Sequence, residues 1–181
     1  REYLLAYQFV VESDFRALTP RIKFAFFENL PARLQPAYYW VFPKDERTAN
    51  VGVVCTARGA LKKGDPDLKK MLSDALAREG LQDAAILEKG GGVAPSGMLP
   101  RLVYGNILLV GDAAGLTSAL HGGGIDLACL SGVLAVEAIS HGQSGVAGYE
   151  KKLQTYLKER TALEDVAISK MRSLSFDEFD D

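Results

Sequence analysis

Residues 106–115, Asn-Ile-Leu-Leu-Val-Gly-Asp-Ala-Ala-Gly, decide how the second half of the chain folds. The run up to Val110 is apolar after its first residue, which is typical of a strand buried on both faces, as in a parallel sheet. It ends abruptly at Gly111-Asp112. An acidic residue at the carboxyl end of such a strand lies in the crevice where open α/β sheets bind ligands. We therefore expect a ligand at Asp112, whose carboxylate can accept hydrogen bonds from neighbouring hydroxyl groups.

Three glycines, Gly122 to Gly124, follow this stretch and precede an apolar run that predicts a buried helix from Ile125 to about Ser140. The first amides of a helix have no intrahelical partner, and the positive end of its dipole suits an anionic group. Taken separately, the Gly-Asp pair could be a turn and the glycines a tight loop. Together, and at this spacing, they favour a ligand site.

The composition sets the broad class of the protein. The chain has 181 residues, 48% of them apolar, which is enough for one sizeable domain or a domain with an appendage. The formal net charge of −2 gives no electrostatic reason to expect nucleic acid or an acidic membrane as a partner. Neither composition nor charge identifies a ligand.

The two cysteines and the absence of targeting signals bear on location. Cys55 and Cys129 lie in apolar settings without nearby cysteines or paired histidines, which predicts buried reduced thiols, no metal site and a cytoplasmic protein. The sequence contains no long apolar span and no signal peptide, so we expect a soluble protein or one in peripheral contact with a membrane. It starts at Arg1 and runs directly into a strand-like segment, which suggests a cut from a longer chain.

The first half of the chain predicts an antiparallel sheet. Runs of apolar, aromatic and β-branched residues predict short strands, and the polar segment 43–48 has the length of a hairpin connection. The predicted strands are 3–12, 21–28, 38–42, 49–55 and one near 83–89. Asp65 and Pro66 are the expected N-cap and first residue of a helix that ends at Gly80. Gly90-Gly91-Gly92 is interpreted as a plain loop.

Aromatic residues alternate along the third predicted strand. Tyr38, Trp40 and Phe42 share one face, because side chains of a strand alternate with period two. Two interpretations remain open. The three rings could form a wall beside an apolar ligand, or they could be the core face of a sheet packed under a helix.

The glycine-rich stretches resemble a known motif. Leu109 to Gly115, followed by Gly122 to Ile125, is similar to the second flavin-binding motif of the para-hydroxybenzoate hydroxylase-like flavoproteins. The resemblance implies that the motif aspartate contacts the flavin ribityl chain and that the glycine-rich helix start approaches the pyrophosphate and the isoalloxazine ring. The cofactor-binding residues that it implies are Gly111, Asp112, Ala113, Ala114, Gly122, Gly123, Gly124 and Ile125.

A second resemblance selects one branch of that superfamily. Residues 36–44 are similar to the Tyr-x-Trp-x-Phe-Pro signature of the geranylgeranyl reductase family, and Asn50-Val51-Gly52 matches the segment after it. The resemblance implies an FAD-dependent enzyme of lipid biosynthesis that reduces C=C bonds of an isoprenoid chain by hydride transfer, with NAD(P)H or another reductant as electron donor. Tyr38, Trp40 and Phe42 would then contact a prenyl-lipid substrate.

Two other functions remain as alternatives. One is a flavin-dependent monooxygenase or halogenase of the same superfamily. The other is a non-catalytic protein that binds a lipid or quinone, or an electron-transfer flavoprotein.

The chain also departs from the expected pattern. The family commonly has Pro where this chain has Ala119, and Thr or another small residue at His121. His121 could deliver a proton or could be an ordinary lining residue, and we name no catalytic residue. The first dinucleotide fingerprint, Gly-x-Gly-x-x-Gly, is absent, so we expect the adenine side of the site on a missing N-terminal segment. The chain alone should bind FAD poorly.

The sequence as a whole predicts an α+β fold. We expect an antiparallel-sheet substrate-binding domain at 1–100, then the strand, loop and helix that complete a Rossmann-like FAD domain at 101–140. A C-terminal helical segment is expected at 141–181.

Overall fold

The computed structural model describes residues 2–27, 30–58, 64–65 and 67–173. These residues form two compact units. The first unit comprises residues 4–93, and the second comprises residues 94–173 together with residues 2 and 3. Each unit has its own hydrophobic core.

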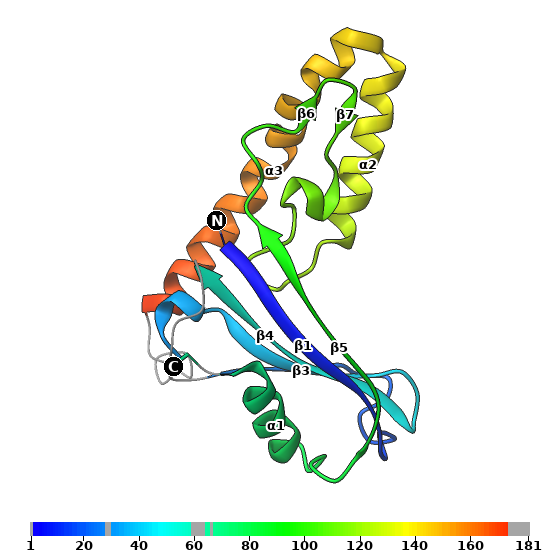
Figure 1. Cartoon of the computed structure of the whole chain (residues 1–181), viewed down its shortest axis with the longest axis vertical. Coiled ribbons are helices and arrows are strands. Elements are labelled where there is room, and N and C mark those ends of the chain that lie inside the picture. Colours follow the sequence, from blue (N-terminus) through cyan, green and yellow to red (C-terminus); the bar gives the residue numbers. More distant parts are fainter. Residues whose placement is uncertain (1, 28–29, 59–63, 66, 174–181) are drawn as a thin grey trace. The chain divides into compact units, whose positions relative to one another are not determined.

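The first unit is built on a five-stranded sheet with the strand order β2-β3-β4-β1-β5 (Figure 1). Its strands are β1 (Glu2–Glu12), β2 (Lys23–Phe26), β3 (Ala37–Pro43), β4 (Thr48–Arg58) and β5 (Ala85–Ser96), with the short helix η1 (Ala32–Leu34) before β3. β3 pairs antiparallel with both β2 and β4. The predicted antiparallel sheet is therefore confirmed.

The turn between β3 and β4 is held by Asp45. Its carboxylate accepts hydrogen bonds from the backbone N–H groups of Arg47 and Thr48, at 2.8 and 2.7 Å, and from the Thr48 hydroxyl at 2.8 Å. These hydrogen bonds, led by that from the Arg47 amide, lower the pKa of Asp45. The predicted hairpin at 43–48 is present, and its side-chain contacts fix where the second strand begins.

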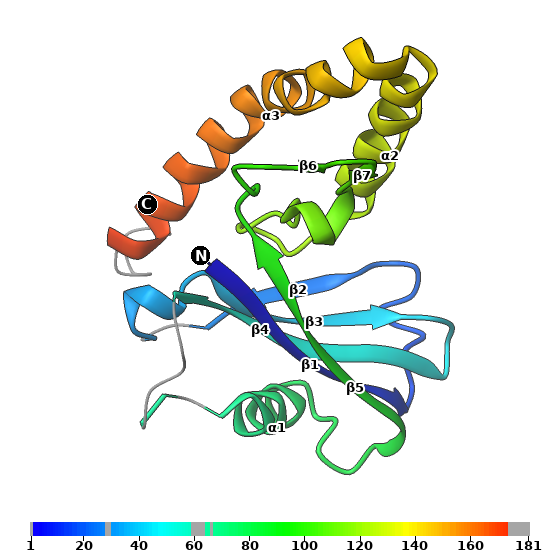
Figure 2. The ribbon, with the colours of Figure 1, turned by 45° about the horizontal axis from the view of Figure 1, so that its top comes forward.

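Helix α1 (Leu68–Arg78) covers one face of the sheet (Figure 2). The strands present every second residue to this face, and the helix contributes residues at helical spacing. The resulting core contains Val11, Tyr39, Val41, Val51, Val53, Cys55, Met71, Leu72, Ala75 and Leu76. Tyr39 lies on this core face, so Tyr38 and Trp40 lie on the opposite face.

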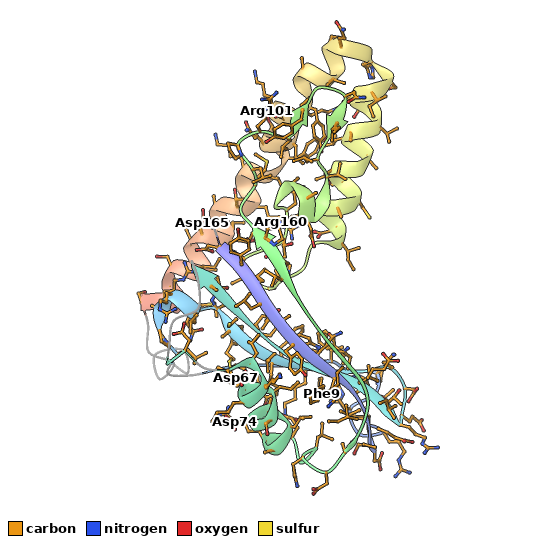
Figure 3. All side chains as sticks on the ribbon, in the orientation of Figure 1. Phe9, Asp67, Asp74, Arg101, Arg160 and Asp165 are labelled. Carbon is orange, nitrogen blue, oxygen red and sulfur yellow. The ribbon has the colours of Figure 1, made fainter. Side chains whose placement is uncertain are left out.

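The start of α1 differs from the expectation by two residues. The N-cap is Asp67, whose carboxylate accepts a hydrogen bond from the Lys69 N–H at 3.0 Å (Figure 3). Asp65 forms an ion pair with Arg33 instead. The prediction that Asp65 is the N-cap was therefore wrong, because its carboxylate binds Arg33, a residue distant in sequence. Pro66, the predicted first residue of the helix, lies outside the described residues.

The glycines at 90–92 lie within β5 rather than in a loop, so that prediction was wrong. A Cβ atom at Gly91 would lie 2.9 Å from the Ala6 carbonyl oxygen of the neighbouring strand. The backbones approach so closely there that a side chain would not fit. Gly91 therefore permits the close approach of β1 and β5 at this point.

The second unit contains a short hairpin and two long helices. Its elements are β6 (Val103–Tyr104), β7 (Ile107–Leu108), η2 (Gly111–Ala114), α2 (Ile125–Ser140) and α3 (Gly142–Ser173). β7 pairs antiparallel with β6, and Ile107 is 58% exposed. The expectation that 106–110 is a doubly buried strand of a parallel sheet is therefore wrong for the described chain, because β7 pairs only with the antiparallel β6 and Ile107 remains exposed.

Helices α2 and α3 pack against each other to form the core of this unit. Tyr149 of α3 is 1% exposed, and its hydroxyl donates to the Leu109 carbonyl at 2.9 Å. α2 buries only one of its faces, and its exposed apolar residues are Ile125, Val133, Val136 and Ile139. Cys129 is exposed as well, so its predicted burial was wrong. His141 is the C-cap of α2, and its Nδ1 lies 2.8 Å from the Glu137 carbonyl oxygen.

The described residues include neither a membrane-spanning helix nor a metal-binding cluster. None of the helices there combines the length and apolarity needed to cross a bilayer. No cluster of three or more histidine, cysteine, aspartate or glutamate side chains lies there in an arrangement suited to a metal ion.

The cap at Asp67 gives a stability prediction. Replacing Asp67 by Ala leaves helix amides without their acceptor and should lower the free energy of unfolding by about 1 kcal/mol. Asp67→Asn keeps a capping oxygen and should retain most of that stability. Urea unfolding followed by circular dichroism at 222 nm measures both, and an Ala variant as stable as the parent would contradict the assignment.

Candidate functional site

The structure brings Asp112 and the glycine run together. The Asp112 Oδ1 atom accepts a hydrogen bond from the Thr117 hydroxyl at 2.9 Å. A Cβ atom at Gly124, the N-cap of α2, would lie 3.4 Å from that same oxygen. The carboxylate therefore lies at the amino end of α2, although ten residues separate Asp112 from Gly122 in the sequence.

Left-handed glycines fix the loop that carries Asp112. Gly111 has a φ of +52°, and its N–H donates to the Ser131 hydroxyl at 3.0 Å. Gly115 has a φ of +76°, and a Cβ there would lie only 2.5 Å from the Gly97 carbonyl oxygen. Other residues adopt such φ values at a cost, and the second position has no space for a side chain.

The residues between these two glycines differ in their exposure to solvent. Asp112 and Ala113 are exposed, whereas Ala114 is buried in the core of the unit. Ala114 therefore packs inside the protein, and Asp112 and Ala113 are the members of this group that a ligand can reach.

The glycine run is a closed turn before α2. The Ser118 N–H donates to the Gly123 carbonyl at 2.8 Å, and the Gly122 N–H donates to the Ser118 carbonyl at 3.0 Å. The Gly123 N–H donates to His121 Nδ1 at 3.1 Å, so a neutral His121 ring carries its proton on Nε2. His121 therefore folds against its own loop, an arrangement that does not need a catalytic role.

The first turn of α2 is also tied to α3. Arg160, labelled on α3 in Figure 3, forms an ion pair with Asp126 and a second one with Glu164 at 3.2 Å. The hydrogen bond from Arg160 is the main cause that lowers the pKa of Asp126. This pair fixes the helix start that carries Gly124 and Ile125, and both of those residues are at least partly accessible.

These residues fit one side of a flavin. An exposed carboxylate suits the hydroxyls of a ribityl chain, and glycines at a helix start allow close approach of an anionic or polar edge. The observation that carries this fit is the absence of a side chain at Gly124 beside the Asp112 carboxylate.

The predicted aromatic residues lie together on the face of the sheet opposite α1. The ring centroids of Tyr38 and Trp40 are 6.2 Å apart, and those of Trp40 and Phe42 are 5.9 Å apart. The alternative that this stripe is the core face under a helix does not hold for the described residues, because Tyr39 and Val41 occupy that face. The Tyr39 hydroxyl donates a hydrogen bond of 2.6 Å to the carboxylate of Glu79, the C-cap of α1.

Asn50 and Gly52 explain the second part of the signature. β4 pairs with β3 so that Gly52 lies opposite Trp40 and Asn50 lies opposite Phe42. The Trp40 indole N–H donates to the Asn50 side-chain oxygen at 2.7 Å. A Cβ at Gly52 would lie 2.1 Å from the Cζ2 atom of Trp40, so the indole fills the space of the missing side chain.

None of the three aromatic side chains carries a formal charge at physiological pH. Burial raises the pKa of Tyr38 to about 12, so its phenol stays neutral at physiological pH. Lys23 pairs in register with Val41 of the core face and binds Glu79 at 2.8 Å. Its charge therefore lies on the other side of the sheet.

The sequence pattern did not identify some of the residues that form these sites. Thr117 and Ser131 support the loop around Asp112, and no local pattern marks them because their partners are distant or lie in an irregular segment. Phe24 and Phe26 belong to the aromatic face through the pairing of β2 with β3. Their period-two spacing was a signal that could have identified them.

Known proteins resemble this chain in sequence and in fold. No family model matches the sequence. The chain is 35% identical over 154 residues to the digeranylgeranylglycerophospholipid reductase of Methanocaldococcus jannaschii, covering 76% of this chain and 39% of that protein. It matches the crystal structure of a geranylgeranyl bacteriochlorophyll reductase-like protein from Thermoplasma acidophilum with a TM-score of 0.80 and 26% identity, covering 99% of this chain and 46% of the other.

The chain belongs to the geranylgeranyl reductase family. This is a family of flavoprotein reductases, which implies a flavin cofactor and a reductant. The chain spans less than half the length of the two proteins just described. A variant of a flavin-dependent brominase shares the fold, with a TM-score of 0.70 at 15% identity over 97% of this chain and 47% of the other.

Gly115 gives a test of the loop geometry. Gly115→Ala should lower the free energy of unfolding of its unit by about 2 kcal/mol or more, because the residue has a positive φ and lacks space for a Cβ. Gly148→Ala is the matched control, since nothing lies within 4 Å of a Cβ there and the residue is in α3. It should stabilise by up to about 1 kcal/mol. Urea unfolding followed at 222 nm compares them, and equal effects would contradict the geometry.

Proposed function

We propose that this chain is part of an FAD-dependent enzyme that reduces C=C bonds of a geranylgeranyl chain carried by a lipid. The proposal rests chiefly on the uncharged aromatic face around Trp40, in a chain 35% identical to a named digeranylgeranylglycerophospholipid reductase. The Thermoplasma protein supports the same class of substrate by its name. The lipid substrate is a reason to expect contact with a membrane surface.

Different residues would bind the flavin and the prenyl chain. Asp112 would accept a hydrogen bond from a ribityl hydroxyl, and the backbone of Gly122 to Ile125 would approach the pyrophosphate or the flavin ring. Tyr38, Trp40 and Phe42 would contact the prenyl chain and exclude water from it. A flavin reduced by NAD(P)H or another donor supplies the hydride when bound, and the protein contributes placement and an apolar surface.

The adenine side of the cofactor would be bound outside these 181 residues. The chain lacks the Gly-x-Gly-x-x-Gly fingerprint, and it spans 39% of the Methanocaldococcus protein. The full-length protein is therefore the right material for experiments with cofactor.

Anaerobic turnover tests the proposed reaction. The flavin of the full-length protein is reduced, oxygen is excluded, and a geranylgeranyl lipid is added while flavin absorbance is followed. Reoxidation that depends on the lipid, with a product heavier by two mass units per bond reduced, is the expected result. A saturated lipid of the same head group is the control and should leave the flavin reduced.

The same assay separates the alternative functions. A monooxygenase or halogenase would reoxidise its flavin only after oxygen is admitted. The fold shared with the brominase variant is the reason to test this alternative. A protein that merely binds a lipid or quinone would bind the geranylgeranyl lipid without oxidising flavin. Either result would overturn the reductase proposal.

Asp112 gives a test of the cofactor site. In the full-length protein, Asp112→Ala should weaken flavin binding by about 10- to 100-fold, because a hydrogen bond to a charged acceptor contributes about 1.5–3 kcal/mol. Asp112→Asn keeps an acceptor oxygen and should lose less. Flavin retained during dialysis, measured by absorbance, gives the affinities. Unchanged binding in the Ala variant would remove Asp112 from the site.

A further inference from the structure

Strand β2 adds two rings to the aromatic face. Phe24 pairs in register with Trp40, and Phe26 pairs with Tyr38. The centroid of Phe24 lies 5.0 Å from that of Phe42 and 5.6 Å from that of Tyr38, and the Phe26 centroid lies 5.9 Å from that of Tyr38. We call the continuous patch of Phe24, Phe26, Tyr38, Trp40 and Phe42 the five-ring surface.

The rings of β2 are the most accessible part of the five-ring surface. Phe24 is 48% exposed and Phe26 is 42% exposed, whereas Tyr38 is 6% exposed. Large adjacent aromatic groups at the surface of a protein are more often a binding site than an accident, because their exposure to water is unfavourable. Their edge-to-face packing, with interplanar angles of 68° to 74°, holds the rings in a defined arrangement.

The position of Trp40 is set from β4. Asn50 accepts the indole hydrogen bond, and Gly52 leaves the space that the six-membered part of the indole occupies. With the polar N–H already bonded to Asn50, the ring contributes apolar surface and no unsatisfied donor. Asn50 and Gly52 therefore act through Trp40 rather than by touching a ligand themselves.

We propose that Phe24 and Phe26 extend the prenyl-binding surface toward the edge of the sheet, and that Asn50 and Gly52 are positioning residues that hold Trp40 in it. This inference rests on the proposed function. A polyisoprenoid is the occupant that the chemistry favours, because it is long, uncharged and without hydrogen-bonding groups. The five-ring surface has no formal charge, since Lys23 points to Glu79 on the other side. A longer surface should favour longer chains.

The single tryptophan of the chain makes the inference measurable. Trp40 emission of the 181-residue chain is recorded during titration with geranylgeraniol and with the shorter geraniol. We expect a saturable change and an affinity for geranylgeraniol at least about tenfold higher, since each additional buried CH₂ group strengthens binding. Equal affinity for the two alcohols would overturn the idea that surface length selects chain length.

Variants of β2 test the new contact residues. Phe24→Ala and Phe26→Ala should each weaken geranylgeraniol binding by about tenfold, because each removes a large apolar contact. Phe24→Leu and Phe26→Leu should weaken it less and guard against loss of folding. Leu87→Ala is the control, since Leu87 is an apolar residue that is 52% exposed on β5, the other edge strand. Binding by both Leu and Ala variants equal to that of the parent would overturn the proposal.

Variants of β4 test the positioning role. Asn50→Val removes the acceptor and Gly52→Ala places a methyl group inside the indole, so both should shift Trp40 emission in the free protein and weaken binding. Asn50→Asp keeps an acceptor oxygen and should restore the emission. Gly92→Ala is the matched glycine control, because nothing lies within 4 Å of a Cβ there. Unchanged emission in Asn50→Val and Gly52→Ala would overturn the role.

Two further results separate this inference from the proposed function. If the full-length protein fails to reoxidise flavin anaerobically while prenyl binding still depends on Phe24 and Phe26, the reductase proposal fails and this surface remains. If turnover occurs but is insensitive to these phenylalanines, the surface assignment fails alone. Sedimentation of the chain with and without geranylgeraniol gives the last check, because a stable dimer that loses its contact in Phe24→Ala would make a second copy the occupant.

Discussion

The register between β3 and β4 is the constraint on which both faces of the sheet depend. It places Trp40 opposite Gly52, and the indole needs that gap because a Cβ there would lie 2.1 Å from it. It also places Tyr39 and Val41 in the core with α1. A slip by one residue would exchange the two faces, burying one aromatic set and exposing the other. The hydrogen bonds of Asp45 in the intervening turn fix the start of β4 and so protect this register.

Much of this arrangement follows from local pattern. Alternation predicted that Tyr38, Trp40 and Phe42 share a face, and the polar segment after Phe42 predicted the hairpin. Pattern alone did not decide whether that face was core or surface, because alternation identifies two faces without saying which one a helix will cover. The position of α1, which depends on contacts far apart in sequence, decided it. The contacts of Asn50 and Gly52 with Trp40 could be recognised only from the pairing of β3 with β4.

The wrong predictions have the same origin. Asp65 has the right residue type for a cap, but its ion pair with Arg33 is a long-range contact that no local signal announces. The glycines of β5 suggest a loop until the neighbouring strand and its Ala6 carbonyl are in place. The apolar run before Gly111 predicts a doubly covered strand, yet within the described chain β7 has only β6 beside it. Whether a run of apolar residues is buried depends on which elements are available to cover it.

The left-handed glycines at both ends of the Asp112 loop have a consequence for the entropy cost of the flavin binding that we propose. Gly111 is bonded to Ser131 of α2, and Gly115 is enclosed by the Gly97 backbone, so the loop is shaped by protein contacts alone. A loop that is already ordered loses little conformational entropy when a ligand arrives. In the flavin site that we propose, this loop therefore already has its final conformation before the cofactor binds, and the ordering cost of binding falls on the residues that hold the rest of the cofactor.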